Sequence, residues 1–146
     1  AAYADDTKAS NGRAVRMPGT HREWAMSYPI PRDIADSVAQ GEQWHCYAVA
    51  RIETTPGNEN DEGTGMTLGL YDRANRKSEA YRGLKVKELN PASGEYQLID
   101  LGVHPLTTDM YFWAAPPERP DIVTALWVDR FFIIRESVSD EAPAVE

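Results

Sequence analysis

The arrangement of apolar residues in short runs constrains the fold of this sequence more than any other feature. Runs rich in Val, Ile, Thr, Tyr, Phe and Trp alternate with Gly, Pro, Asn and Asp along most of the 146 residues. The clearest run covers residues 43–54, where every second side chain from Trp44 to Ile52 is apolar. A two-residue period places these side chains on one face of a β-strand, and Tyr47 and Val49 make the opposite face apolar as well. This run therefore predicts a strand in the middle of a sandwich sheet.

Further strand-like runs follow one another, with turn signals between almost every pair. They cover residues 14–17, 23–30, 66–71, 79–89, 95–101, 109–114 and 124–135. One short helix is predicted over residues 33–40, with Asp33 as its N-cap and Gly41 just past its end. Short strands without intervening helices favour a sandwich or barrel over a parallel α/β sheet. The sequence predicts one all-β domain over residues 1–136, with at most one short helix, and an acidic tail or linker over residues 137–146.

Charge and hydropathy argue against two classes of partner. The chain has 15 basic and 23 acidic side chains, which gives a net charge of −8. It has no Lys/Arg cluster, so this charge repels nucleic-acid backbones and anionic lipid headgroups. No apolar run approaches the ~18 residues needed to cross a bilayer. We therefore expect neither nucleic acid nor a membrane as a partner.

The cysteine and histidine content indicates neither a disulfide nor a catalytic metal centre. The only cysteine, Cys46, cannot form an internal disulfide and has no Cys or His companions at ligand spacing. We expect it to be a small buried apolar residue. The three histidines, His21, His45 and His104, are far apart in the sequence. The nucleophile elbow, the phosphate-binding glycine loop and the zinc-protease motif are also absent.

One cluster at the close of a strand fits the requirements of sugar recognition. A pyranose ring needs a flat apolar surface for its C–H faces and planar polar groups for its adjacent hydroxyls. Tyr71, Asp72 and Arg73 supply a ring and hydrogen-bonding groups in one short stretch. The alternative is that these residues form only a solvated turn between two strands.

Two other positions are candidates for ligand binding. Trp113 precedes Ala-Ala-Pro-Pro at the end of a strand, so it either faces a loop-lined cleft or joins the core like the other tryptophans. His21 and Arg22 lie at the start of a strand, where they either join a polar site or form a surface salt bridge with Glu23.

Short motifs near both ends of the chain resemble those of a known family. The opening Ala9-Ser10-Asn11-Gly12 and the closing Trp127-x-Asp129-x-Phe131 resemble galactose-binding-like carbohydrate-binding modules. The middle of the chain is similar to the β-sandwich modules attached to large bacterial glycoside-hydrolase-like proteins of uncharacterised function. The phrases that carry this second similarity, in this order, are at residues 44–47, 69–72, 94–102 and 110–117.

The resemblance implies a jelly-roll sandwich without catalysis of its own, which works in an extracellular or periplasmic location. It also implies a structural calcium ion in many relatives, held by an acidic residue of the last strand and by oxygens of the N-terminal segment. The matching position is Asp129, with Glu23 or Asp6 as partners, although the paired-glutamate phrase of the calcium-binding relatives is absent.

Two functions follow as expectations. In the first, the domain is a non-catalytic carbohydrate-binding module that targets a larger polysaccharide-acting protein to its polysaccharide or oligosaccharide. In the second, it is a structural accessory domain that packs against the catalytic domain of a parent protein through an apolar patch and binds no ligand. A third class, a small-molecule lyase or hydrolase, requires a pocket in which His45 or His104 meets carboxylates.

Overall fold

The computed structural model describes residues 2–19, 26–32, 43–107 and 109–136. Within these ranges the strands are β1 (Ala2–Asp5), β2 (Arg13–Pro18), β3 (Met26–Pro29), β4 (Trp44–Thr54), β5 (Thr64–Asp72), β6 (Lys77–Lys85), β7 (Gln97–His104), β8 (Met110–Ala114) and β9 (Val123–Arg135). Two 3₁₀ helices, η2 (Lys87–Leu89) and η3 (Pro91–Ser93), connect β6 to β7. The helix predicted over residues 33–40 and the tail over 137–146 lie outside the described residues.

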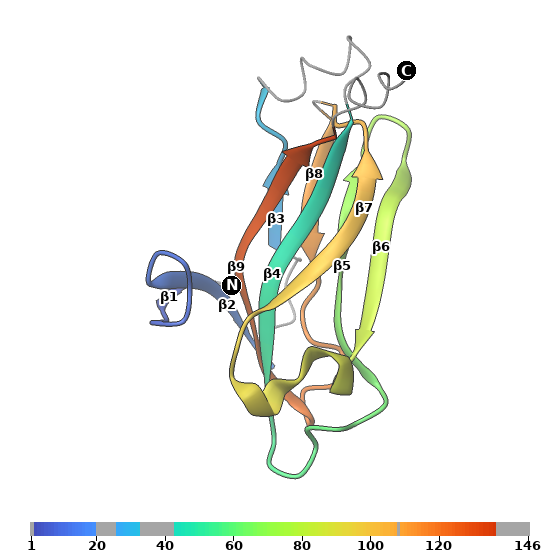
Figure 1. Cartoon of the computed structure of the whole chain (residues 1–146). Helices are drawn as coiled ribbons and strands as arrows, with labels where there is room; N and C mark the ends of the chain where they lie inside the picture. The colour runs from blue at the N-terminus through green and yellow to red at the C-terminus, as the bar shows by residue number, and fades with distance from the viewer. Residues whose placement is uncertain (1, 20–25, 33–42, 108, 137–146) are drawn as a thin grey trace, which may run out of the picture.

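The strands form two antiparallel sheets that pack face to face (Figure 1). Sheet A has the order β1-β2-β9-β4-β7, and sheet B has the order β3-β8-β5-β6. This arrangement confirms the predicted all-β sandwich. Between β2 and β9 the chain passes repeatedly from one sheet to the other, which favours the two Greek keys of a jelly roll. The jelly-roll assignment itself stays a prediction.

The core between the sheets follows the alternation seen in the sequence. The apolar side chains of β4 from Trp44 to Ile52 that share one face are all buried, as predicted. They pack in one cluster with Leu68 and Leu70 of sheet B. Cys46 is fully buried in this cluster, and burial raises the pKa of its thiol to about 12. The expectation that Cys46 acts as a buried apolar residue is confirmed.

The predicted strand over residues 79–89 is too long. β6 ends at Lys85, and Val86 adopts helical dihedral angles, φ −52° and ψ −49°. Glu88 accepts a hydrogen bond from the backbone N–H of Lys85 at 2.7 Å, and Leu89 is buried. The apolar residues that prolonged the strand pattern therefore reach the core from a 3₁₀ turn, which the two-residue period did not reveal.

Candidate functional site

Four aromatic side chains gather on the outer face of sheet B, which is turned away from sheet A. In β8 the buried Phe112 lies between Tyr111 and Trp113, so both of these rings point outward. β5 contributes Tyr71 and β6 contributes Tyr81 to the same face, because pairing partners in a sheet share a face. We call Tyr71, Tyr81, Tyr111 and Trp113 the aromatic face.

Strand pairing sets these rings in two rows. Tyr71 is directly opposite Tyr111, and their ring centroids are 5.7 Å apart. Gly69 has Trp113 opposite on one side and Tyr81 on the other, and the centroids of those two rings are 5.9 Å apart. Strands separated by one intervening strand are about 9–10 Å apart. The Trp113 and Tyr81 rings therefore lean toward each other over Gly69.

Only a glycine fits under this pair of rings. A Cβ atom at position 69 would lie 2.2 Å from the carbonyl oxygen of Ala80 and 3.0 Å from Cζ2 of Trp113. The missing side chain lets the rings close over the strand and form one continuous apolar surface. Aromatic cover of a strand glycine also stabilises the sheet, so the pair has a structural role whatever it binds.

The aromatic face is open to solvent and carries no charge between its rings. Tyr81 is 62% exposed, and the other three rings are half-buried. In the two rows the register places only uncharged residues beside the rings, namely Ser27, Pro29, Gly69 and Ser78. The face can therefore offer apolar ring surface and tyrosine hydroxyls to a ligand.

The predicted cluster at the close of β5 is divided by the structure. Arg73 stays with the aromatic face, and its guanidinium carbon lies 5.8 Å from the centroid of the Tyr111 ring. Asp72 is buried and holds the β5–β6 turn, where it accepts hydrogen bonds from the side chain of Asn75 at 2.7 Å and from its backbone N–H at 3.3 Å. These bonds lower the pKa of the Asp72 carboxyl. Its place in the turn keeps it from facing a ligand.

Sequence reasoning missed two members of the aromatic face. Tyr111 carries a local signal, because it is two residues from Trp113 with the apolar Phe112 between them. Tyr81 carries no such signal, because the neighbours of this residue in β6 are mostly polar or charged. Only the pairing of β6 with β5 brings it beside Trp113. The predicted residues His21 and Arg22 lie outside the described residues.

The residues predicted to bind calcium are engaged in other contacts. Asp129 accepts hydrogen bonds from the backbone N–H and the hydroxyl of Ser10, both at 3.1 Å. Asp6 is in contact with the guanidinium of Arg51, whose positive charge opposes a cation at the same carboxylate. Glu23 lies outside the described residues. Within the described ranges no three His, Cys, Asp or Glu side chains gather as ligands. The calcium site stays a prediction.

Asp6 and Arg51 instead fasten the N-terminal segment to sheet A. Nη2 and Nε of Arg51 donate to one oxygen of Asp6 at 2.7 and 3.1 Å, and the Tyr96 hydroxyl donates to the same oxygen at 2.7 Å. Burial alone would raise the pKa of Asp6, but the bonds from Tyr96, Arg51 and the backbone N–H of Lys8 outweigh burial and lower it. The Arg51 guanidinium also lies 4.6 Å from the Trp127 ring centroid. This cluster is structural.

Two histidines meet carboxylates, one pair within sheet A and the other between the two sheets. His45 Nε2 is 2.8 Å from Asp100, and His104 Nδ1 is 3.2 Å from Glu79. His45 lies on the outer face of sheet A, stacked on Tyr47 with ring centroids 4.4 Å apart. The first pair joins β4 to β7 within sheet A, and the second joins β7 to β6, the edge strands of the two sheets. The third, enzymatic class stays untested by these contacts.

The outer face of sheet A also exposes apolar side chains. Leu98, Val103 and Ile134 are 63%, 38% and 54% exposed. All three lie on the side of the sheet that carries His45, because Val103 and Ile134 are opposite His45 and Leu98 is opposite Val49. We call Leu98, Val103 and Ile134 the sheet A patch.

Comparison with known proteins supports the fold alone. No family model matches the chain, and no curated protein matches its sequence. Among solved structures, the chain is similar to the arabinose-bound MgGH51 α-L-arabinofuranosidase, with a TM-score of 0.50 and 12% sequence identity. The similarity covers 91% of this chain and 21% of that one, so the chain spans about a fifth of the length of the glycosidase chain. Within the described ranges, no helix has the length and hydropathy of a bilayer-spanning segment.

Proposed function

We propose that this domain is a non-catalytic carbohydrate-binding module that holds a larger polysaccharide-acting protein against its glycan. The aromatic face carries this proposal. Four rings on one side of a sheet, paired at interplanar angles of 49° and 47°, offer apolar ring faces on which the C–H faces of sugar rings stack, and the tyrosines carry hydroxyls for hydrogen bonds. The domain then raises the local concentration of its partner at the substrate.

The chemistry of the face favours an uncharged glycan bound along its chain. The strand partners of the rings in the two rows are uncharged, Arg73 lies against Tyr111, and the net charge of −8 repels acidic polysaccharides at longer range. The rings lie on the face of a sheet and not in an enclosed pocket, which suits the interior of a polymer. The same proposal places the domain in an extracellular or periplasmic location, where such polymers occur.

The experiment is titration of soluble neutral polysaccharides, such as xylan, arabinan and hydroxyethyl cellulose, followed by calorimetry and affinity electrophoresis. Trp113→Ala and Tyr81→Ala should each weaken binding about tenfold or more, which corresponds to about 1.4 kcal/mol. Tyr3→Ala is the matched control, because Tyr3 is an exposed tyrosine of β1 on sheet A. Loss of binding in the control as well, or no binding to any polymer by the parent protein, contradicts the proposal.

A second function is favoured by the sheet A patch. Val103 and Ile134 flank His45, and Leu98 lies further along the same face, so an apolar partner surface can cover them together. The occupant we infer is a neighbouring domain of a longer polypeptide, because the similar solved chain is about five times longer than the part that matches. Hydroxyl-radical footprinting should then show Leu98 and Ile134 protected in the full-length protein and accessible in this chain alone. Equal labelling in both contexts contradicts this docking role.

A further inference from the structure

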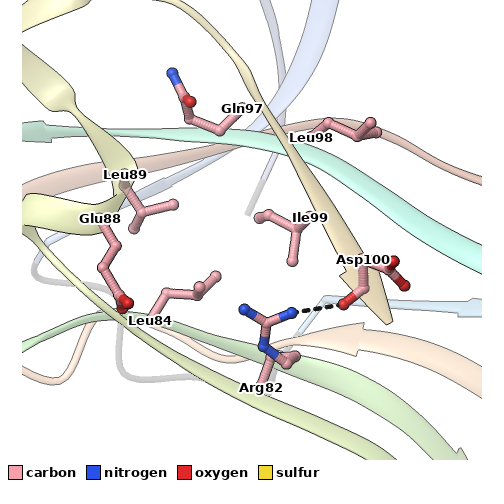
Figure 2. Close-up of a pocket in the computed structure, with 8 residues that line it drawn as sticks. All are labelled: Arg82, Leu84, Glu88, Leu89, Gln97, Leu98, Ile99 and Asp100. Atoms are coloured by element: carbon pink, nitrogen blue, oxygen red, sulfur yellow. Dashed lines mark hydrogen bonds between the residues drawn. The ribbon is translucent and has the colours of Figure 1, made fainter. Parts of the chain in front are cut away.

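A cleft opens where the edges of the two sheets face each other. β6 is an edge strand of sheet B, β7 is an edge strand of sheet A, and η2 closes the connection between them. The cleft has a volume of about 300 Å³ and is lined by residues of these three elements (Figure 2). We call it the edge cleft. It lies apart from the aromatic face, whose rings are on the outer side of sheet B.

The floor of the edge cleft is apolar. Leu84, Leu89 and Ile99 point toward one another across it in Figure 2, and all three are at most 7% exposed. Three planar polar groups, those of Arg82, Glu88 and Gln97, lie around this floor. The cleft therefore combines a small apolar base with a larger polar rim.

Each polar group of the rim is held in place by a bond to the backbone. Arg82 donates from Nη1 to the carbonyl oxygen of Asp100 at 2.7 Å, as the dashed line in Figure 2 shows. Glu88 accepts the backbone N–H of Lys85 through Oε1 at 2.7 Å. Gln97 donates from Nε2 to the carbonyl oxygen of Glu95 at 3.2 Å.

These bonds leave hydrogen-bonding atoms for a ligand. Two donors, Nε and Nη2 of Arg82, make no hydrogen bond to the described residues. Two acceptors, Oε2 of Glu88 and Oε1 of Gln97, receive none from them. The rim thus offers both donors and acceptors on groups whose orientation is already fixed. Pre-orientation of this kind reduces the entropy that a ligand must remove on binding.

We propose that the edge cleft is a second saccharide site, which binds a neutral monosaccharide or disaccharide unit such as a chain end. Adjacent hydroxyls on a sugar ring match planar groups that donate and accept, and the C–H face of the ring covers the leucine and isoleucine floor. The volume is at the lower end of the range for small-ligand pockets, about 300–1,000 Å³, which suits one or two sugar rings. The charges of Arg82 and Glu88 balance in the rim, and the net charge of −8 over the chain disfavours an acidic sugar.

The proposal is tested by NMR titration of the whole chain with L-arabinose, D-xylose, D-galactose, cellobiose and D-galacturonate, each up to about 50 mM, because single sugar units bind at about millimolar dissociation constants or weaker. At least one neutral sugar should shift the backbone amide signals of β6, η2 and β7. Arg82→Lys and Gln97→Met should each weaken that binding about tenfold. Trp113→Ala should leave it unchanged.

Two outcomes overturn the proposal while leaving the aromatic face in place. The first is polymer binding without any effect of the small sugars on β6, η2 and β7. The second is small-sugar binding that Trp113→Ala abolishes and Arg82→Lys does not, which places the sugar on the aromatic face.

Two further outcomes bear on the ligand class and on the aromatic face. Tighter binding of galacturonate than of galactose contradicts the proposal that the ligand is a neutral sugar. Small-sugar binding at the cleft without polymer binding supports this site and contradicts the function proposed for the aromatic face.

Discussion

The two outer faces of the sandwich both carry aromatic side chains, yet they use them differently. On sheet A several rings are engaged by the protein's own charges: Arg51 lies against Trp127 and Tyr96, and Arg130 lies 4.9 Å from the Phe132 ring centroid, although Tyr47 stacks between His45 and Phe132. On sheet B the rings of the aromatic face form two pairs, one of which encloses a glycine, and Arg73 alone among the described cations lies against one of them. An aromatic residue on a strand surface therefore indicates a binding surface only when other side chains do not already cover it.

The sheet A cluster should be the more costly of the two to break. Arg51→Met removes the partner of a carboxylate whose side chain is only 7% exposed, so we expect a loss of about 3 kcal/mol in the free energy of unfolding, measured by urea denaturation. The control is Arg13→Met, because Arg13 and Asp5 are both exposed and 4.0 Å apart. A change of about 0.5 kcal/mol or less is expected there. Equal losses in the two variants would show that the cluster does not fasten the N-terminal segment.

The same cluster should make the stability of the domain depend on pH. The pKa of Asp6 is lowered in the folded protein from its ordinary 3.8, so its contribution to stability is present above pH 3.8 and is lost as the pH falls through the folded pKa. Asp6→Asn should therefore be less stable than the parent protein at pH 7, and the difference should shrink below pH 3.8. Denaturant unfolding at a series of pH values measures this. A difference that stays constant in acid contradicts an ionised Asp6.

On sheet B the largest structural effect is expected at the glycine under the rings. Gly69→Ala places a Cβ 2.2 Å from a backbone oxygen, so the strands must shift at a cost of about 1–3 kcal/mol. Gly83→Ala is the matched control in the neighbouring strand, where the nearest atom is 3.8 Å away on the Tyr81 ring. We expect no loss of stability in the control. If thermal unfolding shows the two substitutions to be equivalent, the rings do not close over Gly69 as described.

The smallest effect on folding should come from the sheet A patch. Leu98→Ser and Ile134→Ser replace exposed side chains, so each should change the free energy of unfolding by about 0.5 kcal/mol or less. The double variant should still weaken any contact with a neighbouring domain. This is measured in the longer protein as increased hydroxyl-radical labelling of the residues around the patch. A large loss of stability in this chain alone would show that the patch belongs to its own core.

The strand content and the burial of the central strand could be predicted because they depend on local periodicity. The alternation from Trp44 to Ile52 predicted which side chains of β4 are buried, and Cys46 is buried among them. Strand ends were less well predicted, since Val86 and Leu89 continue an apolar pattern through a 3₁₀ turn. β1 was not predicted, because its short run is stabilised by pairing with β2 and by the contacts of Asp6.

The sequence by itself determined that the chain is built of β-strands around one core, because a two-residue period of apolar side chains places them on one face of each strand. It also marked Tyr71 and Trp113 as candidates from their places near strand ends. Only the tertiary structure decided that Tyr81 joins them and that Asp72 does not. It likewise brought Asp6 to Arg51 and Asp129 to Ser10, 45 and 119 positions apart in the chain. The physical reason is that strand order and register determine which distant residues meet, and no local pattern records either.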